Sequence, residues 1–370
     1  MKSKKIAALF TVLCAILLVV AFKFVRDTGI LRGYPKAEYL TDEEAACRPV
    51  YEQLKNNEKA IYTALCRGIS EHRESIPLPY EVNGDEYSKI YCILEKQEGD
   101  FFFLDSVYYT APKVRDARVA YRDLSNIDAE KNELRSKVRE IAEGAVYSDD
   151  YYLAKYINDY IVNNCRYITG EDVEYASTAY GCLIEGEANC EGYAKAFDLL
   201  ASEMGLQSVL ITGVTDTGEN HAWNQVKVGT DWYNIDVTWA DTDVIGETRQ
   251  MYFLCDDTTF EKTHIADEEL FEPFQCGKAD NNYYVKNDLY ADSAGKAAEI
   301  ILRELKNGND VIELRFTDEA AYNEFKNEYI RTEEVFEIAV DSGYPFGEQI
   351  NLSLKENTQE HCMTLNFNAQ

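Results

Sequence analysis

The amino-acid sequence predicts an α+β protein built from several domains. The chain has 370 residues, more than one ordinary domain needs, and its hydrophobic fraction of 46% and charged fraction of 28% are typical of globular proteins. Segments with helical spacing of apolar residues alternate with short runs rich in aromatic and β-branched residues. We therefore expect mixed helices and sheets in more than one core.

The N-terminus predicts export from the cytoplasm. Lys2, Lys4 and Lys5 precede an apolar run, Ile6–Phe22, whose end at Val19-Val20-Ala21 offers small residues for a signal peptidase. The run is also just long enough to span a bilayer. Residues 1–28 are thus expected to be a cleaved signal peptide or a membrane anchor, with the rest of the protein extracytoplasmic, secreted or tethered to the membrane.

The charge balance argues against nucleic acid as a partner. Lys and Arg total 37 against 66 Asp and Glu, a formal net charge of -29. An acidic surface repels phosphates and keeps a protein soluble.

Residues 29–124 are expected to form an accessory α+β region. Thr41 with Glu44 has the form of a capping box, and a helical pattern follows toward Arg73 until Pro77 and Pro79. The runs Tyr87–Leu94 and Phe101–Tyr109 predict strands because they are rich in aromatic and β-branched residues.

Residues 125–275 are expected to form the central domain. From Asp149, apolar residues recur at helical spacing, and a polar loop leads to a second helix that Cys190 opens and Gly205 ends. Three strands should follow, at 207–212, 221–228 and 231–238.

Residues 281–370 are expected to form a small C-terminal α+β domain. Helical spacing over 297–305 stops near Gly308. Strand-like runs lie at 311–316, 335–340, 350–354 and 362–367.

Cys190 is the candidate nucleophile. The partial positive charge of a helix N-terminus favours a thiolate over a thiol. Backbone N–H groups in the first turn lack intrahelical partners, so they could donate to an oxyanion on an attacked carbonyl.

His221 and Asp236 are the candidate base and orienting acid. Of the four histidines, His72, His264 and His361 lie in acidic surroundings that suggest exposed positions. If Gly229-Thr230 forms a two-residue hairpin turn, opposed residues sum to 459, and His221 and Asp236 are diagonal neighbours on one face of the sheet. A slip of one residue would separate them, so this pairing depends on the register.

Each candidate also has a structural reading. Cys190 could be a buried thiol, His221 a strand residue with satisfied hydrogen bonds, and Asp236 a turn former at a strand end. Their order, spacing and shared face together favour a catalytic triad. Trp232 is expected in the core, while Trp223 and Trp239 could either join the core or shield the triad.

The cysteines leave disulfide pairing open. The chain has ten, and the spacing of eight besides Cys14 and Cys190 suggests no framework, so buried unpaired thiols are the favoured reading. No CxxC or His-rich cluster predicts zinc, and no metal or other cofactor is expected.

Three sequence blocks resemble the transglutaminase-like superfamily, in its prokaryotic, protease-like branch: 186–194 around Cys190, 221–224 beginning at His221, and 231–239 containing Asp236. The resemblance is convincing over 151–239. It implies a papain-like α+β core in which Cys190 is the nucleophile, His221 the base and Asp236 the orienting acid.

Asn189 departs from the small apolar residue usual before the cysteine, and Tyr180 is a weak candidate for a second oxyanion donor. No acidic cluster has the spacing of a calcium loop.

These observations predict a thiol enzyme acting on peptide or protein amides through a thioester, by hydrolysis rather than cross-linking. The alternative is a surface binding or scaffold protein that keeps the fold without turnover.

Overall fold

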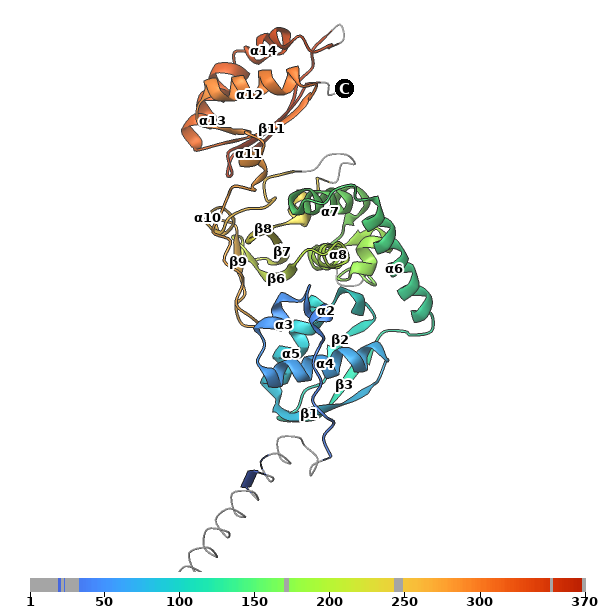
Figure 1. Cartoon of the computed structure of the whole chain (residues 1–370). Coiled ribbons are helices and arrows are strands. Elements are labelled where there is room, and N and C mark those ends of the chain that lie inside the picture. Colours follow the sequence, from blue (N-terminus) through green and yellow to red (C-terminus); the bar gives the residue numbers. More distant parts are fainter. Residues whose placement is uncertain are drawn as a thin grey trace, which may run out of the picture.

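The computed structural model describes residues 19–20, 23, 33–169, 173–242, 249–346 and 349–367. The predicted leader, with Cys14, lies outside these residues except for 19, 20 and 23. No helix within the described ranges combines the length and apolarity needed to cross a bilayer. Three α+β regions follow one another along the chain and are stacked from the blue N-terminal region to the red C-terminal one (Figure 1). The domain boundaries given above remain predictions.

The N-terminal region packs helices on a three-stranded antiparallel sheet of order β1-β3-β2. The helix predicted toward Arg73 is three helices, because Pro49 starts a new one and residues 54–55 break the next. Pro77 and Pro79 lie inside β1, an edge strand, where a missing N–H is tolerated. The elements are α2 (Asp42–Ala45), α3 (Pro49–Gln53), α4 (Asn56–Ser70), β1 (Ser75–Asn83), α5 (Gly84–Gln97), the 3-10 turn η1 (Gly99–Phe101), β2 (Leu104–Tyr108) and β3 (Lys113–Tyr121).

The strand predicted over Tyr87–Leu94 is wrong: these residues belong to helix α5. The Asn83 side chain caps the helix by accepting from the Glu86 N–H at 2.8 Å. Tyr87, Ile90, Tyr91 and Leu94 are buried at helical spacing. Burial of this face and the cap outweigh the β-propensity of the aromatic residues.

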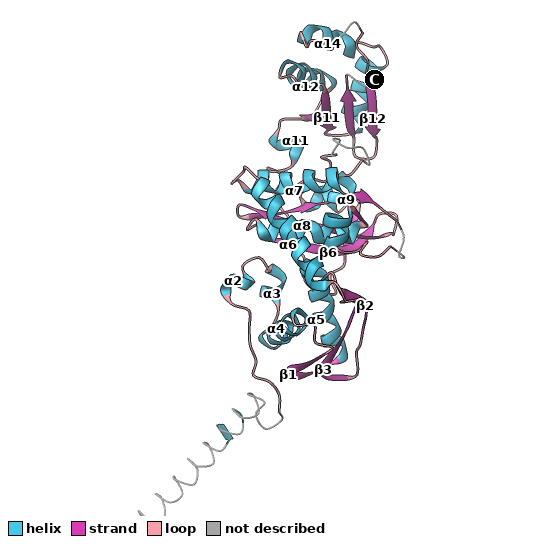
Figure 2. Ribbon diagram, turned by 90° about the vertical axis from the view of Figure 1, so that its right-hand side faces the viewer, coloured by secondary structure: helices cyan, strands magenta, loops and turns pink. Residues whose placement is uncertain are grey.

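The central region contains a four-stranded antiparallel sheet of order β8-β7-β6-β9, covered by α8, which α6 and α7 flank (Figure 2). The predicted helix after Asp149 is α7, and Asp149 is its N-cap. The elements are α6 (Ile127–Gly144), α7 (Asp150–Asn164), β4 (Arg166–Tyr167), the π-helical turn η2 (Gly181–Glu185), β5 (Glu187–Ala188), α8 (Cys190–Glu203), β6 (Ser208–Thr215), β7 (Asn220–Val228), β8 (Asp231–Ile235), α9 (Val237–Ala240), α10 (Asp257–Phe260) and β9 (His264–Ala266).

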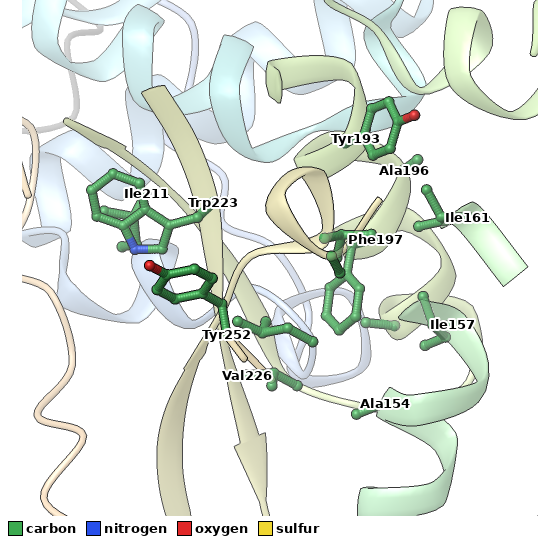
Figure 3. Close-up of a cluster of buried hydrophobic side chains, with 14 of the residues drawn as sticks. Ala154, Ile157, Ile161, Tyr193, Ala196, Phe197, Ile211, Trp223, Val226 and Tyr252 are labelled. Atoms are coloured by element: carbon green, nitrogen blue, oxygen red, sulfur yellow. The ribbon is translucent and has the colours of Figure 1, made fainter. Parts of the chain in front are cut away.

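Helix α8 is held between α7 and the sheet by its apolar face. Phe197 is fully buried between side chains of α7, including Ile157, and of β7, including Val226 (Figure 3). Truncating a buried phenylalanine costs about 3–5 kcal/mol. Gly192, in the first turn, has no room for a side chain, because a Cβ there would lie 2.5 Å from the Ala176 carbonyl oxygen. This close packing fixes the start of α8, where Cys190 lies.

The C-terminal region packs helices on a mixed sheet of order β10-β11-β13-β12. The strand predicted over 335–340 is wrong, because Val335 and Ala339 are buried one helical turn apart in α14. The elements are α11 (Tyr283–Lys286), β10 (Tyr290–Ala291), α12 (Ala294–Lys306), β11 (Val311–Phe316), α13 (Glu319–Phe325), the π-helical turn η3 (Lys326–Ile330), α14 (Val335–Ser342), β12 (Ser353–Asn357) and β13 (Cys362–Asn366).

Candidate active site

Cys190 is the first residue of α8, as predicted. Its half-buried side chain packs against Ala194, Leu210 and Ala222. Strand β5 leads directly into it and pairs in parallel with β4. The thiol therefore lies where the N-terminus of α8 meets β6 and β7, the two inner strands of the central sheet.

Asn189 is the N-cap of α8. Its Oδ1 accepts hydrogen bonds from the N–H groups of Glu191 at 3.1 Å and Gly192 at 3.2 Å, and its Nδ2 donates to Ser177 Oγ at 2.7 Å. We expected the N–H groups of the first turn to be free for an oxyanion, but the cap occupies two of them. The N–H of Cys190 itself is the donor that this cap leaves open.

His221 and Asp236 lie side by side because the hairpin has the predicted register. Val228 pairs with Asp231 and Asn224 with Ile235, so opposed residues sum to 459. His221 Nε2 lies 2.7 Å from Asp236 Oδ2. Strand β8 ends at Ile235 rather than at Thr238, and Asp236 is the N-cap of α9, accepting from the Trp239 N–H through Oδ1 at 3.0 Å.

The His221 ring lies between the carboxylate and the thiol. Nε2 faces Asp236, and the ring also interacts with the Cys190 side chain, for which Nδ1 is the remaining nitrogen. Burial alone would lower the pKa of His221, but the Asp236 carboxylate and then the Cys190 side chain raise it to about 10. Burial would raise the pKa of Asp236, but His221 and His264 hold it well below its usual range. This electrostatic setting favours the imidazolium form of His221 beside the Asp236 carboxylate.

His264 is the polar neighbour of Asp236 that the sequence did not predict. It was expected to be exposed, yet it is 1% exposed, on β9, with Nε2 3.0 Å from Asp236 Oδ2. The acidic residues that follow it suggested a surface loop. A strand of three residues is too short to show a period, so no local pattern marks its burial.

The two tryptophans left open both lie against the imidazoles. The ring of Trp223, which is buried, is centred 6.2 Å from that of His221, and the half-buried Trp239 ring is centred 5.4 Å away. They shield the His–Asp pair from water. Trp232, expected in the core, is half-buried and stacks on Phe274 at 4.0 Å.

Tyr180 is not an exposed loop residue. It is 5% exposed, its ring stacks on Phe102 at 4.8 Å, and its hydroxyl donates to Glu133 Oε2 at 3.1 Å. Its hydroxyl is thus held by α6, and no contact with Cys190 or His221 is recorded among the described residues. This arrangement gives Tyr180 a packing role.

A four-residue ion network joins the first turn of α8 to the N-terminal region. Lys195 lies 2.8 Å from Glu191 and also pairs with Glu95 of α5, while Lys96 lies 2.7 Å from Glu191. Burial would raise the pKa of Glu191, but Lys195 and Lys96 lower it to about 2. The residue after Cys190 is therefore anchored from outside the central sheet.

A metal ion is not needed to explain the cluster at Asp236. One donor atom each from His221, Asp236 and His264 lies within 4.8 Å of the others, a grouping that could hold a cation. Both imidazole nitrogens are, however, at hydrogen-bonding distance from the same oxygen, 2.7 and 3.0 Å, whereas zinc–ligand bonds are about 2.0–2.2 Å. The nine cysteines of the described ranges form no disulfide.

The similarity to known proteins lies in the central region. Residues 136–237 match the transglutaminase-like superfamily. The kyphoscoliosis peptidases of Mus musculus and Homo sapiens are 29% and 28% identical over 126 residues, which cover 28% of this chain. The chain spans 19% of the length of these relatives.

Two solved structures give weaker matches. A proposed cysteine protease from Cytophaga hutchinsonii is 20% identical with a TM-score of 0.25, over 30% of this chain and 37% of that one. A structure described as a TGase is 14% identical with a TM-score of 0.28, over 42% and 47%. TM-scores this low do not define a common fold for whole chains. Residues 136–237 of this α+β chain are thus similar to the transglutaminase-like superfamily core.

Proposed function

We propose that this protein is a thiol enzyme that cleaves peptide or protein amides through Cys190, His221 and Asp236. The observation that carries the proposal is the His221 ring, which is hydrogen-bonded to the Asp236 carboxylate at 2.7 Å and interacts electrostatically with the Cys190 side chain. A thiolate made by proton transfer to His221 is a competent nucleophile at neutral pH.

The proposed reaction has two steps. The Cys190 thiolate attacks the amide carbonyl, and the Cys190 N–H donates to the oxyanion that forms. His221 then gives its proton to the leaving amine, the C–N bond breaks and a thioester remains. Water, deprotonated by His221, then attacks the thioester. The acid leaves, and the proton that His221 took from water returns the Cys190–His221 pair to its starting state.

Hydrolysis is proposed over cross-linking because the matched curated relatives are peptidases. A primary amine in place of water would give a cross-linker by the same chemistry. Mass spectrometry of a glutamine peptide incubated with enzyme and a primary amine separates the two: we expect the acid, and an amine adduct as the main product would contradict hydrolysis.

The nucleophile is tested by alkylation. Iodoacetamide should label Cys190 of the native protein at pH 5–6, where an ordinary thiol is inert. Labelling in His221→Ala should require alkaline pH, and Cys190→Ala should lack turnover. Ordinary thiol reactivity in the native protein, unchanged in His221→Ala, would point instead to a silent binding protein.

We also propose that the enzyme acts outside the cytoplasm. The basic residues followed by the apolar run 6–22 support export. Cell fractionation with N-terminal sequencing tests this, and recovery of the full chain in the cytosol would exclude it.

A further inference from the structure

His264 has a defined hydrogen-bonding geometry beside the proposed triad. Strand β9 runs antiparallel to β6, with His264 opposite Thr215. The ring directs Nε2 to Asp236 Oδ2 at 3.0 Å and Nδ1 to Thr263 Oγ1 at 2.9 Å. Both nitrogens therefore have partners although the side chain is fully buried.

These partners determine which atom of the ring donates to Asp236. The Asp236 carboxylate can only accept, so Nε2 of His264 must carry a proton. Thr263 Oγ1 lies 2.9 Å from Nδ1, and its other partners are the Phe260 carbonyl oxygen at 3.4 Å and the Tyr252 side chain. Whichever way this hydroxyl is turned, His264 points the N–H of Nε2 at the carboxylate.

Three donors consequently fix the Asp236 carboxylate. Oδ2 accepts from His221 and from His264, and Oδ1 accepts from the Trp239 N–H. The proposed reaction uses a thiolate, an imidazolium and a carboxylate, which together carry one net negative charge. The N–H of His264 Nε2 stabilises that charge by donating to the carboxylate.

We propose that His264 is a positioning residue of this enzyme: its Nε2–H keeps the Asp236 carboxylate turned toward His221 and stabilises the anionic resting state of the triad. This inference rests on the proposed function. It gives β9, outside the family match over 136–237, a part in the chemistry.

The surroundings of His264 hold the ring in place. Its ring stacks on Phe260 at 3.9 Å, and the rings of Trp239, Trp223 and Tyr252 are centred 4.5, 5.1 and 5.2 Å away. The ionisable groups in these recorded contacts are Asp236, His221 and Tyr252. Low polarity around the ring strengthens the hydrogen bond and excludes water that could replace it.

The test compares His264→Gln with His264→Met. Both remove the aromatic ring and have similar volume, but only glutamine retains an N–H donor. We expect turnover in His264→Met to fall about ten- to a hundredfold. The rate of Cys190 alkylation falls on the acid side of its pH profile, and we call this part of the profile the acid limb. In His264→Met the acid limb should move up by about one pH unit, because loss of the donor makes protonation of the anionic triad easier. His264→Gln should keep the acid limb near its native position.

A common loss of rate in the two variants with native acid limbs would show that His264 only fills space, and native behaviour of both would show no role at all. Melting temperatures accompany each measurement. ¹⁵N NMR of the native protein, with only four histidines to assign, provides a readout that needs no variant. A protonated Nε2 at neutral pH is expected, and an unprotonated one would overturn the inference.

The same experiments separate the two proposals. An unreactive Cys190 in the native protein defeats the proposed function. A reactive Cys190 with no difference between the Gln and Met variants defeats only the inference about His264.

Discussion

The central and C-terminal regions each contain a four-stranded sheet covered by helices, but the two sheets bury different side chains. Strands β7, β8 and β9 bury polar residues in a row, namely His221, Asn224, Gln225, Asn234 and His264, with Asp236 just after β8. In the described part of the C-terminal sheet, the buried charged side chain is Arg315, paired with Glu360 at 2.6 Å. Buried polar groups cost stability unless they are hydrogen-bonded, so a sheet that keeps many of them needs a reason other than stability.

The central sheet therefore has a polar network in place of part of its apolar packing. Gln225 donates to Asn234 at 3.0 Å, and Asn234 donates to Asp257 at 2.9 Å, which links β7, β8 and α10. The C-terminal sheet has its own polar contacts, Arg315 with Glu360 and Glu313 with Tyr284, and none of these contacts includes His221 or Asp236. Variants in the two sheets should therefore differ in whether activity or stability responds.

The largest effect is expected for Asp236→Asn. The amide would present an N–H to one of the two imidazoles that now donate to Oδ2, which favours the wrong tautomer of His221. We expect turnover to fall about 10²–10⁴-fold, by analogy with orienting carboxylates in other triads. Steady-state turnover together with the alkylation rate of Cys190 measures this, and a fall of less than threefold would contradict an orienting role.

Arg315→Met should affect stability and leave the chemistry alone. The substitution leaves the buried Glu360 carboxylate without its ion-pair partner, which should lower the free energy of unfolding by about 3–5 kcal/mol. Urea unfolding gives the value. The double variant Arg315→Met with Glu360→Gln is the control and should recover much of the loss. A changed rate of Cys190 alkylation in the folded variant would contradict the proposal that the C-terminal sheet affects stability but not the chemistry.

Lys195→Met tests the ion network at the start of α8. Glu191 and Glu95 would remain close with only Lys96 between them, and we expect a loss of about 2–3 kcal/mol. The pKa of Glu191, now about 2, should rise. A folded pKa below the unfolded value stabilises the protein above the unfolded pKa, and that stability is lost as pH falls through the folded pKa. Acid unfolding should therefore begin at higher pH in the variant, and an unchanged acid midpoint would show that the network is not coupled to folding.

The smallest effect concerns Asp198, buried on α8 and hydrogen-bonded to Ser208 and Asn224. Burial raises its pKa to about 7 despite these hydrogen bonds. The folded state then keeps a proton that the unfolded chain releases near pH 4, so stability should decline as pH rises from about 4 to about 7, by about 1.4 kcal/mol for each pH unit between about 5 and 7. Asp198→Asn should flatten this decline in melting experiments, and an equal slope in both proteins would assign it to other groups.

The parts of the site that the sequence predicted are those set by local rules. A two-residue turn at Gly229-Thr230 sets the hairpin register, and this register brings His221 to Asp236. The helical period before and after Cys190 likewise predicted α7 and α8. Each of these inferences needs only neighbours along the chain.

The predictions that were wrong concern segments whose structure depends on contacts with distant parts of the chain. Tyr87–Leu94 and Val335–Val340 have residues common in strands, but burial of one helical face decided their structure. His264 joins the site because β9 pairs with β6 across a long connection, which no local period encodes. Asn189, noted as a departure from the family pattern, is explained by its cap on α8.

That cap bears on the design of covalent probes. An aldehyde that adds to Cys190 leaves an oxygen anion at the tip of α8, where Asn189 already holds two of the nearby amides. Glycine at position 189 would release both amides at little cost to the helix, since glycine is a tolerated N-cap. Peptide aldehydes should then bind more tightly. The side chain at position 189 would thus set the affinity for such inhibitors while the thiol, the imidazole and the carboxylate stay unchanged.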